Sequence, residues 1–245
     1  MVAMRRVFGR KTRSLGDDPS VVVLRGGRLV GRDFSGRRLT FFSPESVVFE
    51  RCRFDGVVVE GMSFGAGLRD STYIDCTFDG ARFRLPAAGR ARLERCSFRD
   101  VRITEFFCHQ VEMVDCVFSG RVKGGWIRGT VEAEHASELG RERNEITGND
   151  FSLLEMIDVG FAGGVDLTAQ QLPAGPDYVY VADFPAAVRR VRERMLGEPD
   201  LELRRAAFVF IQLWEAWSRG VSSSSSSAGR TSAAVGTRSS TGCSR

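Results

Sequence analysis

The two histidines, His109 and His135, are the side chains whose ordinary pKa lies nearest to neutrality, so they are the first candidates for acid–base or metal chemistry. His135 stands in a polar segment with Glu132, Glu134 and Glu138, a grouping that resembles a metal or general-base cluster. HExxH and HxxxH spacings, which would bring two histidines to one helix face, are absent from the sequence. The sequence therefore predicts a solvated charged loop here and no metal site.

Cys108 and His109 are adjacent, and a cysteine beside a histidine can indicate a thiol nucleophile with its base. Neighbouring residues on an extended strand point to opposite sides, so these two side chains are not expected to meet. We expect Cys108 to face inward and His109 to face outward. The sequence also lacks Walker A, GxSxG and dinucleotide-binding motifs, so it predicts no catalytic and no cofactor-binding residues.

Four further cysteines mark an internal repeat. Cys76, Cys96 and Cys116 follow one another at intervals of twenty residues, each two positions before a phenylalanine, and Cys52 belongs to an earlier copy. The CxxC spacing of metal sites is missing, and stacked coils would hold the sulfurs one strand spacing apart, too far for undistorted disulfides. Cysteine in such positions acts as a small apolar residue. We therefore predict that all four pack inside the fold.

A five-residue period underlies the repeat. Apolar residues recur at every fifth position from Leu24 to Phe64 and again from Tyr73 to Phe118, before Lys123 breaks the series. A helical period of 3.6 does not keep that phase, so a helix is excluded for this region. Five residues fit one short strand with one corner, and four such sides make a coil of twenty residues. The predicted core residues are Phe34, Phe49, Phe54, Phe64, Phe78, Phe83, Phe98, Phe118, Phe151, Phe161, Cys52, Cys76, Cys96 and Cys116.

In this pattern the chain resembles the pentapeptide-repeat family, in which a small residue comes two positions before a central Leu or Phe, usually with Asp or Asn between them. The segments closest to that pattern are Asn149-Asp150-Phe151 and Val165-Asp166-Leu167. The resemblance covers about residues 22–66, 71–125 and 144–174. It implies an all-β solenoid, a right-handed quadrilateral parallel β-helix of stacked 20-residue coils.

Some units depart from the family pattern. Most lack the Asp or Asn before the central residue, and Arg32, Arg37 and Arg121 occupy positions at which the pattern places a small inward residue. We expect such departures in coils whose repeat sequence is degenerate or that lie at an end of the solenoid.

The chain is expected to divide into four segments. These are a basic N-terminal tail (1–21), the β-helix (22–174), a helical cap or dimerisation segment (175–220) and a Ser-rich disordered tail (221–245). The β-helix is interrupted near 65–70 and 124–144, and the second interruption is expected to be a projecting loop or a short helix. Cys52 and Cys76 are 24 residues apart, and the similarity of the sequence blocks around them favours a loop of four extra residues over an extra side with one residue deleted.

Two helices are predicted in the C-terminal segment. Asp183 and Pro185 make a start signal for a helix from Ala186 to Leu196, which Gly197 ends. The segment Glu198-Pro199-Asp200 starts a second helix that ends near Gly220. The second helix is apolar over more than one stripe, so another surface must cover it. A cap over the last coil is favoured over a homodimer interface through these helices, and the two roles can coexist.

Charge and the N-terminal sequence bear on location. The formal net charge is +4, yet residues 28–175 carry 19 basic and 22 acidic residues, a difference of −3, so the ends are the basic parts. The N-terminal residues include no long apolar run of the kind that a signal peptide or a membrane span needs. Reduced thiols suit the cytoplasm, so a cytoplasmic protein without a membrane partner is expected.

Long outward faces and the lack of catalytic motifs favour a non-enzymatic interaction or scaffold module for a protein partner that the sequence does not name. The family resemblance implies an alternative, because some pentapeptide-repeat proteins mimic duplex DNA, bind DNA gyrase and protect it from quinolones or other toxins. That role needs acidic residues on one face, and the outward candidates are Asp55, Asp75, Asp79, Glu94, Asp100, Glu112 and Asp115. An enzyme with its site in residues 124–144 or at the helices is a third hypothesis; full activity of a His109→Ala/His135→Ala variant would contradict it.

Overall fold

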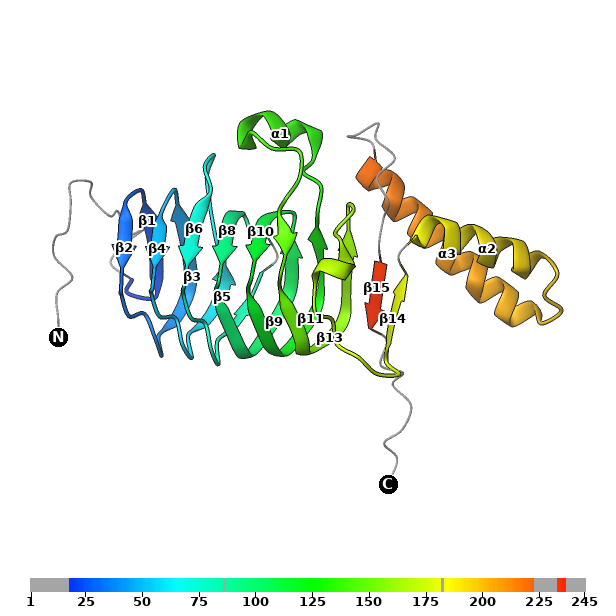
Figure 1. Ribbon diagram of the computed structural model, residues 1–245, viewed down its shortest axis with the longest axis horizontal. Helices are drawn as coiled ribbons and strands as arrows, with labels where there is room; N and C mark the ends of the chain where they lie inside the picture. The colour runs from blue at the N-terminus through cyan, green and yellow to red at the C-terminus, as the bar shows by residue number, and fades with distance from the viewer. Residues whose placement is uncertain (1–17, 86, 182, 223–232, 237–245) are drawn as a thin grey trace, which may run out of the picture.

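The chain folds into a parallel β-solenoid, and Figure 1 shows its coils stacked in order from the blue N-terminal end toward the helices near the C-terminus. The computed structural model describes residues 18–85, 87–181, 183–222 and 233–236. The solenoid fold predicted from the repeat is confirmed. The basic tail up to residue 17 and most of the Ser-rich tail lie outside the described residues.

Two parallel sheets run along the solenoid, and the chain enters them alternately. The strands of the first sheet are, in stacking order, β1 (Val21–Arg25), β3 (Arg38–Glu45), β5 (Val58–Met62), β7 (Arg82–Arg84), β9 (Ser97–Cys108), β11 (Val117–Arg128) and β13 (Asp150–Ala162). Those of the second sheet are β2 (Arg28–Val30), β4 (Val48–Glu50), β6 (Ser71–Ile74), β8 (Arg90–Glu94), β10 (Gln110–Val114) and β12 (Ile146–Thr147). A 3₁₀ turn, Leu167–Ala169, follows β13 in the chain.

The register between coils follows the twenty-residue repeat. Arg82 pairs with Arg102, for example, at that offset. The offset is 24 residues where Val48 pairs with Thr72. The pairing of β5 with β7 has the same offset of 24 residues. Four extra residues therefore lie in the loop between β5 and β6, as the block spacing predicts.

Stacked phenylalanines form the centre of the core. The fourteen predicted core residues are all buried, none with more than 4% of its surface exposed. Six rings from successive coils stack with centroids 4.6–4.9 Å apart, namely Phe34, Phe54, Phe78, Phe98, Phe118 and Phe151. Strands in a sheet are about 4.8 Å apart. The backbone repeat thus sets the distance between the rings.

The five-residue series does not end at Phe118, contrary to the prediction. The next inward residue is Val122, four positions later, because the register between β9 and β11 shifts after Phe118. Lys123 and Arg121 are therefore outward and exposed, and β11 continues to Arg128. The interruption predicted at 124–144 begins only after this strand.

Two arginines in the first coil also lie outside the core. Arg32 and Arg37 occupy positions that the repeat pattern assigns to small inward residues, yet both are exposed. This coil is the terminal one of the described solenoid, so its side chains can reach solvent without leaving a gap between two coils.

The second interruption contains a short helix, α1 (Ala133–Leu139), which begins after Glu132 and ends at Gly140. In Figure 1 α1 projects beyond the coils, above β10 and β11. The predicted short helix is thus present.

Helices α2 (Phe184–Leu196) and α3 (Leu201–Ser222) follow the solenoid. Asp183 caps α2 by accepting a hydrogen bond from the Ala186 N–H, and Gly197 ends it, as the sequence predicts. The two helices lie side by side and extend away from the last coil (Figure 1), with Phe184, Val188 and Ile211 buried between them. No helix in the described part of the chain combines the length and the apolarity needed to cross a bilayer.

Strand β14 (Tyr178–Val181), which precedes the helices, contacts the last coil. Tyr178 and Tyr180 pack against the core, and the Tyr178 hydroxyl accepts a hydrogen bond from the Met156 N–H at 3.3 Å. Within the segment predicted as a disordered tail, residues Ala233–Gly236 form β15, which pairs antiparallel with β14. The cover of the last coil thus includes a tyrosine pair that the helix-based prediction did not foresee.

Candidate interaction surfaces

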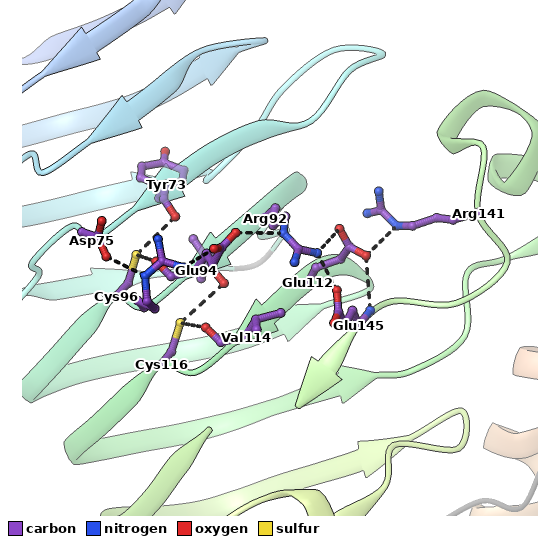
Figure 2. Close-up of polar contacts among 12 residues, drawn as sticks. Tyr73, Asp75, Arg92, Glu94, Cys96, Glu112, Val114, Cys116, Arg141 and Glu145 are labelled. Carbon is purple, nitrogen blue, oxygen red and sulfur yellow. Dashed lines mark hydrogen bonds and ion pairs between the residues drawn. The ribbon is translucent and has the colours of Figure 1, made fainter. Parts of the chain in front are cut away.

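The outward face of β8 and β10 carries a network of arginines and carboxylates, drawn in Figure 2. Arg92 is at its centre, and its guanidinium donates to Glu145 at 2.8 Å, to Glu112 at 3.3 Å and to Glu94 at 3.4 Å. Hydrogen bonds and charge from Glu145 and Glu112 outweigh the opposing effect of burial and raise the pKa of Arg92. The network joins neighbouring coils and leaves few of its charges without a partner.

A second row of charges follows the corner after this sheet. Its members have left-handed backbones with φ of 50–53°, namely Arg51, Asp75, Arg95 and Asp115. Arg95 donates to Asp75 of the preceding coil at 2.8 Å and also pairs with Glu94. Positive φ is unfavourable for arginine. The ion pair of Arg95 with Asp75 joins two coils at this corner.

The acidic residues proposed for a DNA-mimicking face are divided among several parts of the surface. Glu94 and Glu112 lie on the sheet face, where both pair with Arg92, and Asp75 pairs with Arg95 at the corner.

Two further acidic candidates bind the backbone of neighbouring coils. An Asp79 oxygen accepts hydrogen bonds from the Arg99 N–H at 2.8 Å and the Ser97 hydroxyl at 2.6 Å. Asp55 accepts from the Asp79 N–H at 3.1 Å. Carboxylates used in this way support the corners, since oxygens of Asp55 and Asp79 bond to neighbouring coils.

The two loops that interrupt the repeat meet on one side of the solenoid. Arg90, only 7% exposed, donates to Glu138 of α1, to the Leu68 carbonyl at 3.0 Å and to Gln110 at 3.2 Å. Arg141, which follows α1, similarly donates a hydrogen bond to Asp70 in the first loop. Arg90 and Arg141 therefore fasten α1 to the coils and to the other loop.

Sequence reasoning missed both of these arginines. Arg90 and Glu138 are 48 residues apart, and Arg141 and Asp70 are 71 apart. Such pairs have no local spacing signal, because only the stacking of coils brings them together.

Replacing Arg90 by methionine is expected to lower the free energy of unfolding by about 2 kcal/mol, because the Leu68 carbonyl and Gln110 lose their charged donor. Amide exchange in α1 should accelerate, since Glu138 loses its partner. Hydrogen exchange with mass spectrometry measures this directly. Arg69→Met, at an exposed position in the first loop, serves as the control and should leave α1 unchanged.

The structure brings together part of the polar cluster noted in the sequence. Ligand atoms of Glu132, Glu134 and His135 lie within 4.8 Å of one another. Arg128 donates to Glu132 at 2.9 Å, however, and Arg90 approaches the His135 ring at 3.5 Å. Two guanidinium groups beside the cluster compete with a metal cation for the same ligands. The arrangement therefore suits ion pairs that hold α1 better than a metal centre.

Cys108 and His109 face opposite ways, as predicted. Cys108 is fully buried, whereas 44% of the His109 side chain is exposed and its ring stacks near Phe107. Burial raises the pKa of the Cys108 thiol, which opposes formation of a thiolate nucleophile. Burial and then the charge of Arg128 lower the pKa of His109, and Glu132 opposes them.

The lowered pKa of His109 predicts a loss of stability in mild acid. The unfolded chain has the ordinary histidine pKa of about 6.5, so it binds a proton before the folded state does as the pH falls. Stability from neutral His109 is therefore present above that value and is lost below it. Urea unfolding at pH 7.5 and 5.5 should show a smaller drop for His109→Gln than for the natural chain. Equal drops would contradict the assignment.

The inward cysteines of successive coils, Cys52, Cys76, Cys96 and Cys116, form a column within the core. In the coil after Cys116, a side-chain amide takes the place of the thiol. Contact with the Cys76 thiol, followed by burial, raises the pKa of Cys52. In the next coil after Cys116, the column continues with buried Asn149, whose side chain accepts from the Cys116 N–H at 3.0 Å and donates to the Met113 carbonyl at 2.8 Å. These groups pack against one another and bond neighbouring coils.

In the described part of the chain, six of the ten exposed large apolar side chains lie on α2 and α3. These six side chains are 43–70% accessible, namely Val191, Leu196, Leu201, Leu203, Val209 and Phe210. Among the described side chains, Phe184, Val188 and Ile211 form the buried cluster between the helices. The sequence predicts that the second helix needs a covering surface, and the described part of α3 leaves Leu201, Leu203, Val209 and Phe210 exposed.

Comparisons of the chain with protein-family models, with curated proteins and with solved structures found no match.

Proposed function

We propose that the chain is a non-enzymatic repeat protein of the pentapeptide-repeat type that binds a protein partner through the α2–α3 pair. The observation that carries the proposal is the group of large apolar side chains left exposed on these helices. Apolar surface of this kind is characteristic of protein-interaction sites. The solenoid would act as the rigid support from which the helices project.

Two kinds of protein could cover the α2–α3 surface, a different protein or a second copy of the chain. An interface of about 800 Å² per partner is typical of a stable complex. Homodimerisation through these helices is the simpler case and is measured first, by sedimentation equilibrium of the purified chain. Either protein would satisfy the proposal, because both would bury the same side chains.

A paired variant tests the proposal. In Leu203→Ser/Phe210→Ser two exposed apolar side chains of α3 are replaced, which should weaken self-association or cross-linking to a cell-extract partner at least tenfold. Leu153→Ser alters a leucine of β13, outside the α2–α3 pair, that is 78% exposed, and should leave binding intact. Equal binding by the natural chain and both variants, with folding checked by circular dichroism, would refute a role for the helices.

DNA-gyrase binding is the alternative that the family resemblance implies. Inhibition of purified gyrase supercoiling at micromolar levels or below, with or without a quinolone, would favour it. We give it second place because Asp75, Glu94 and Glu112 pair with arginines. No inhibition by the folded protein would leave the α2–α3 proposal in place.

A further inference from the structure

The outward face of β7, β9 and β11 is strongly basic. Each of these adjacent strands presents two outward positions around a buried apolar residue: Phe83, Ile103 or Val122. Five of the six positions are cationic, namely Arg82, Arg84, Arg102, Arg121 and Lys123, and the sixth is Thr104. We call these five residues the basic face.

The register aligns the basic face in rows along the solenoid. Arg82, Arg102 and Arg121 are direct partners in consecutive strands and form one row. Arg84 and Lys123 lie in the next row, on either side of Thr104. Successive strands are about 4.8 Å apart, so the row of three arginines spans about 10 Å.

Two cations of the basic face pair with carboxylates. Arg84 makes a bidentate contact with Glu105 at 2.7 Å, and Arg121 pairs with Glu155 at 2.5 Å. Within the described part of the chain, Arg82, Arg102 and Lys123 have no carboxylate at ion-pair distance, although all three are exposed. Most charges on the β8–β10 face, by contrast, are neutralised by partners such as those of Arg92.

We propose that the basic face binds the phosphodiester backbone of a nucleic acid. This goes beyond the protein-binding role of the α2–α3 pair and uses a different surface. A nucleic acid strand carries one negative charge per nucleotide, about every 3.4 Å of rise in B-DNA, and thus offers a line of charge to a line of cations. Arginine, which supplies four of the five cations, forms bidentate contacts with phosphate.

Charge and shape favour this ligand over other polyanions. The cations are held on one face of a single sheet, and Thr104 is the only uncharged residue among the six outward positions of these described strands. Binding at a lipid surface usually adds apolar side chains that enter the bilayer, and these strands present none among those positions. An acidic peptide carries a lower density of charge on any one side than a phosphodiester chain does.

Fluorescence anisotropy with labelled single-stranded and duplex oligonucleotides tests the proposal on the full chain. Binding should weaken with salt, with a slope of log K against log salt of about −3 for the single strand, from about 0.7 per neutralised phosphate. The triple variant Arg82→Gln/Arg102→Gln/Lys123→Gln should bind at least about tenfold more weakly at 50 mM salt, and the slope should shrink by about 2.

A control variant that loses the same number of positive charges distinguishes an effect of the basic face from an effect of the net charge. Arg32→Gln/Arg69→Gln/Arg190→Gln removes three exposed cations from other parts of the molecule and should bind like the natural chain. Equal weakening by both triple variants, or no binding by the natural chain at 50 mM salt, would overturn the proposal.

Two competitor experiments identify the ligand class. Polyglutamate at matched charge should displace the oligonucleotide poorly, and equal displacement would indicate an acidic protein segment and overturn the proposal. Vesicles containing anionic lipid should bind more weakly than the oligonucleotide. Binding to vesicles without binding to nucleic acid would equally overturn it. Circular dichroism of each variant confirms that lost binding is not lost folding.

Discussion

Replacing Phe98 by alanine is expected to lower the free energy of unfolding by about 3–5 kcal/mol. Its ring is 1% exposed and stacks between Phe78 at 4.6 Å and Phe118 at 4.7 Å. The hydrogen-bonded strands on either side hold the coils at a fixed spacing, so the cavity cannot collapse. Equilibrium unfolding in urea gives the measurement.

A surface phenylalanine provides the matched control for Phe98. Phe41 is 41% exposed on β3, so Phe41→Ala should cost far less than the core substitution. Phe98→Leu keeps most of the apolar volume and should lie between the two, which preserves a readable result if the alanine variant does not fold. Losses below about 1 kcal/mol at Phe78, Phe98 and Phe118 alike would refute the inward stack.

Substitution of Gly89 by alanine is expected to be nearly as damaging, at about 3 kcal/mol or more. Gly89 has a φ of +79° and pairs with Gly65 of the preceding coil in an isolated bridge. A Cβ at Gly89 would overlap the Gly65 carbonyl oxygen, and the backbone on either side leaves little room to move. The cost therefore combines a left-handed backbone with a steric overlap.

Gly36→Ala separates these two contributions. Gly36 has a similar φ of +69°, but a Cβ there meets no atom within 4 Å. The alanine should cost only about 1–2 kcal/mol, from the backbone conformation alone. Thermal and urea unfolding of the two variants give the comparison, and equal losses would show that the contact between coils at Gly65 is unimportant.

The core was predictable because its signal is local. A period of five residues with a small and a large inward side chain recurs along the chain, and a residue's place in that period decides whether it faces inward. The five-residue series was wrongly predicted to end at Lys123. One residue fewer before Val122 shifts the register there, so the series continues one position earlier. A gap of one residue in a weak repeat looks like the end of the repeat in the sequence.

The ends of α2 were also predictable, since they depend on nearby residues. Asp183 accepts from the N–H three residues later, and Gly197 stops the helix. What covers the last coil was less accessible to sequence reasoning. Tyr178 and Tyr180 of β14 contact the core there, and that placement depends on how the chain leaves the solenoid.

The solenoid, its coil length and its buried columns follow from the amino-acid sequence, because each depends on side-chain size at a fixed spacing. Which charges meet depends on the stacking of the coils. Arg90 reaches Glu138 and Arg141 reaches Asp70 across 48 and 71 residues, and the cations of β7, β9 and β11 align on one face. The physical reason is that the register between coils, set by loop insertions and the one-residue shift in β11, fixes every outward neighbour.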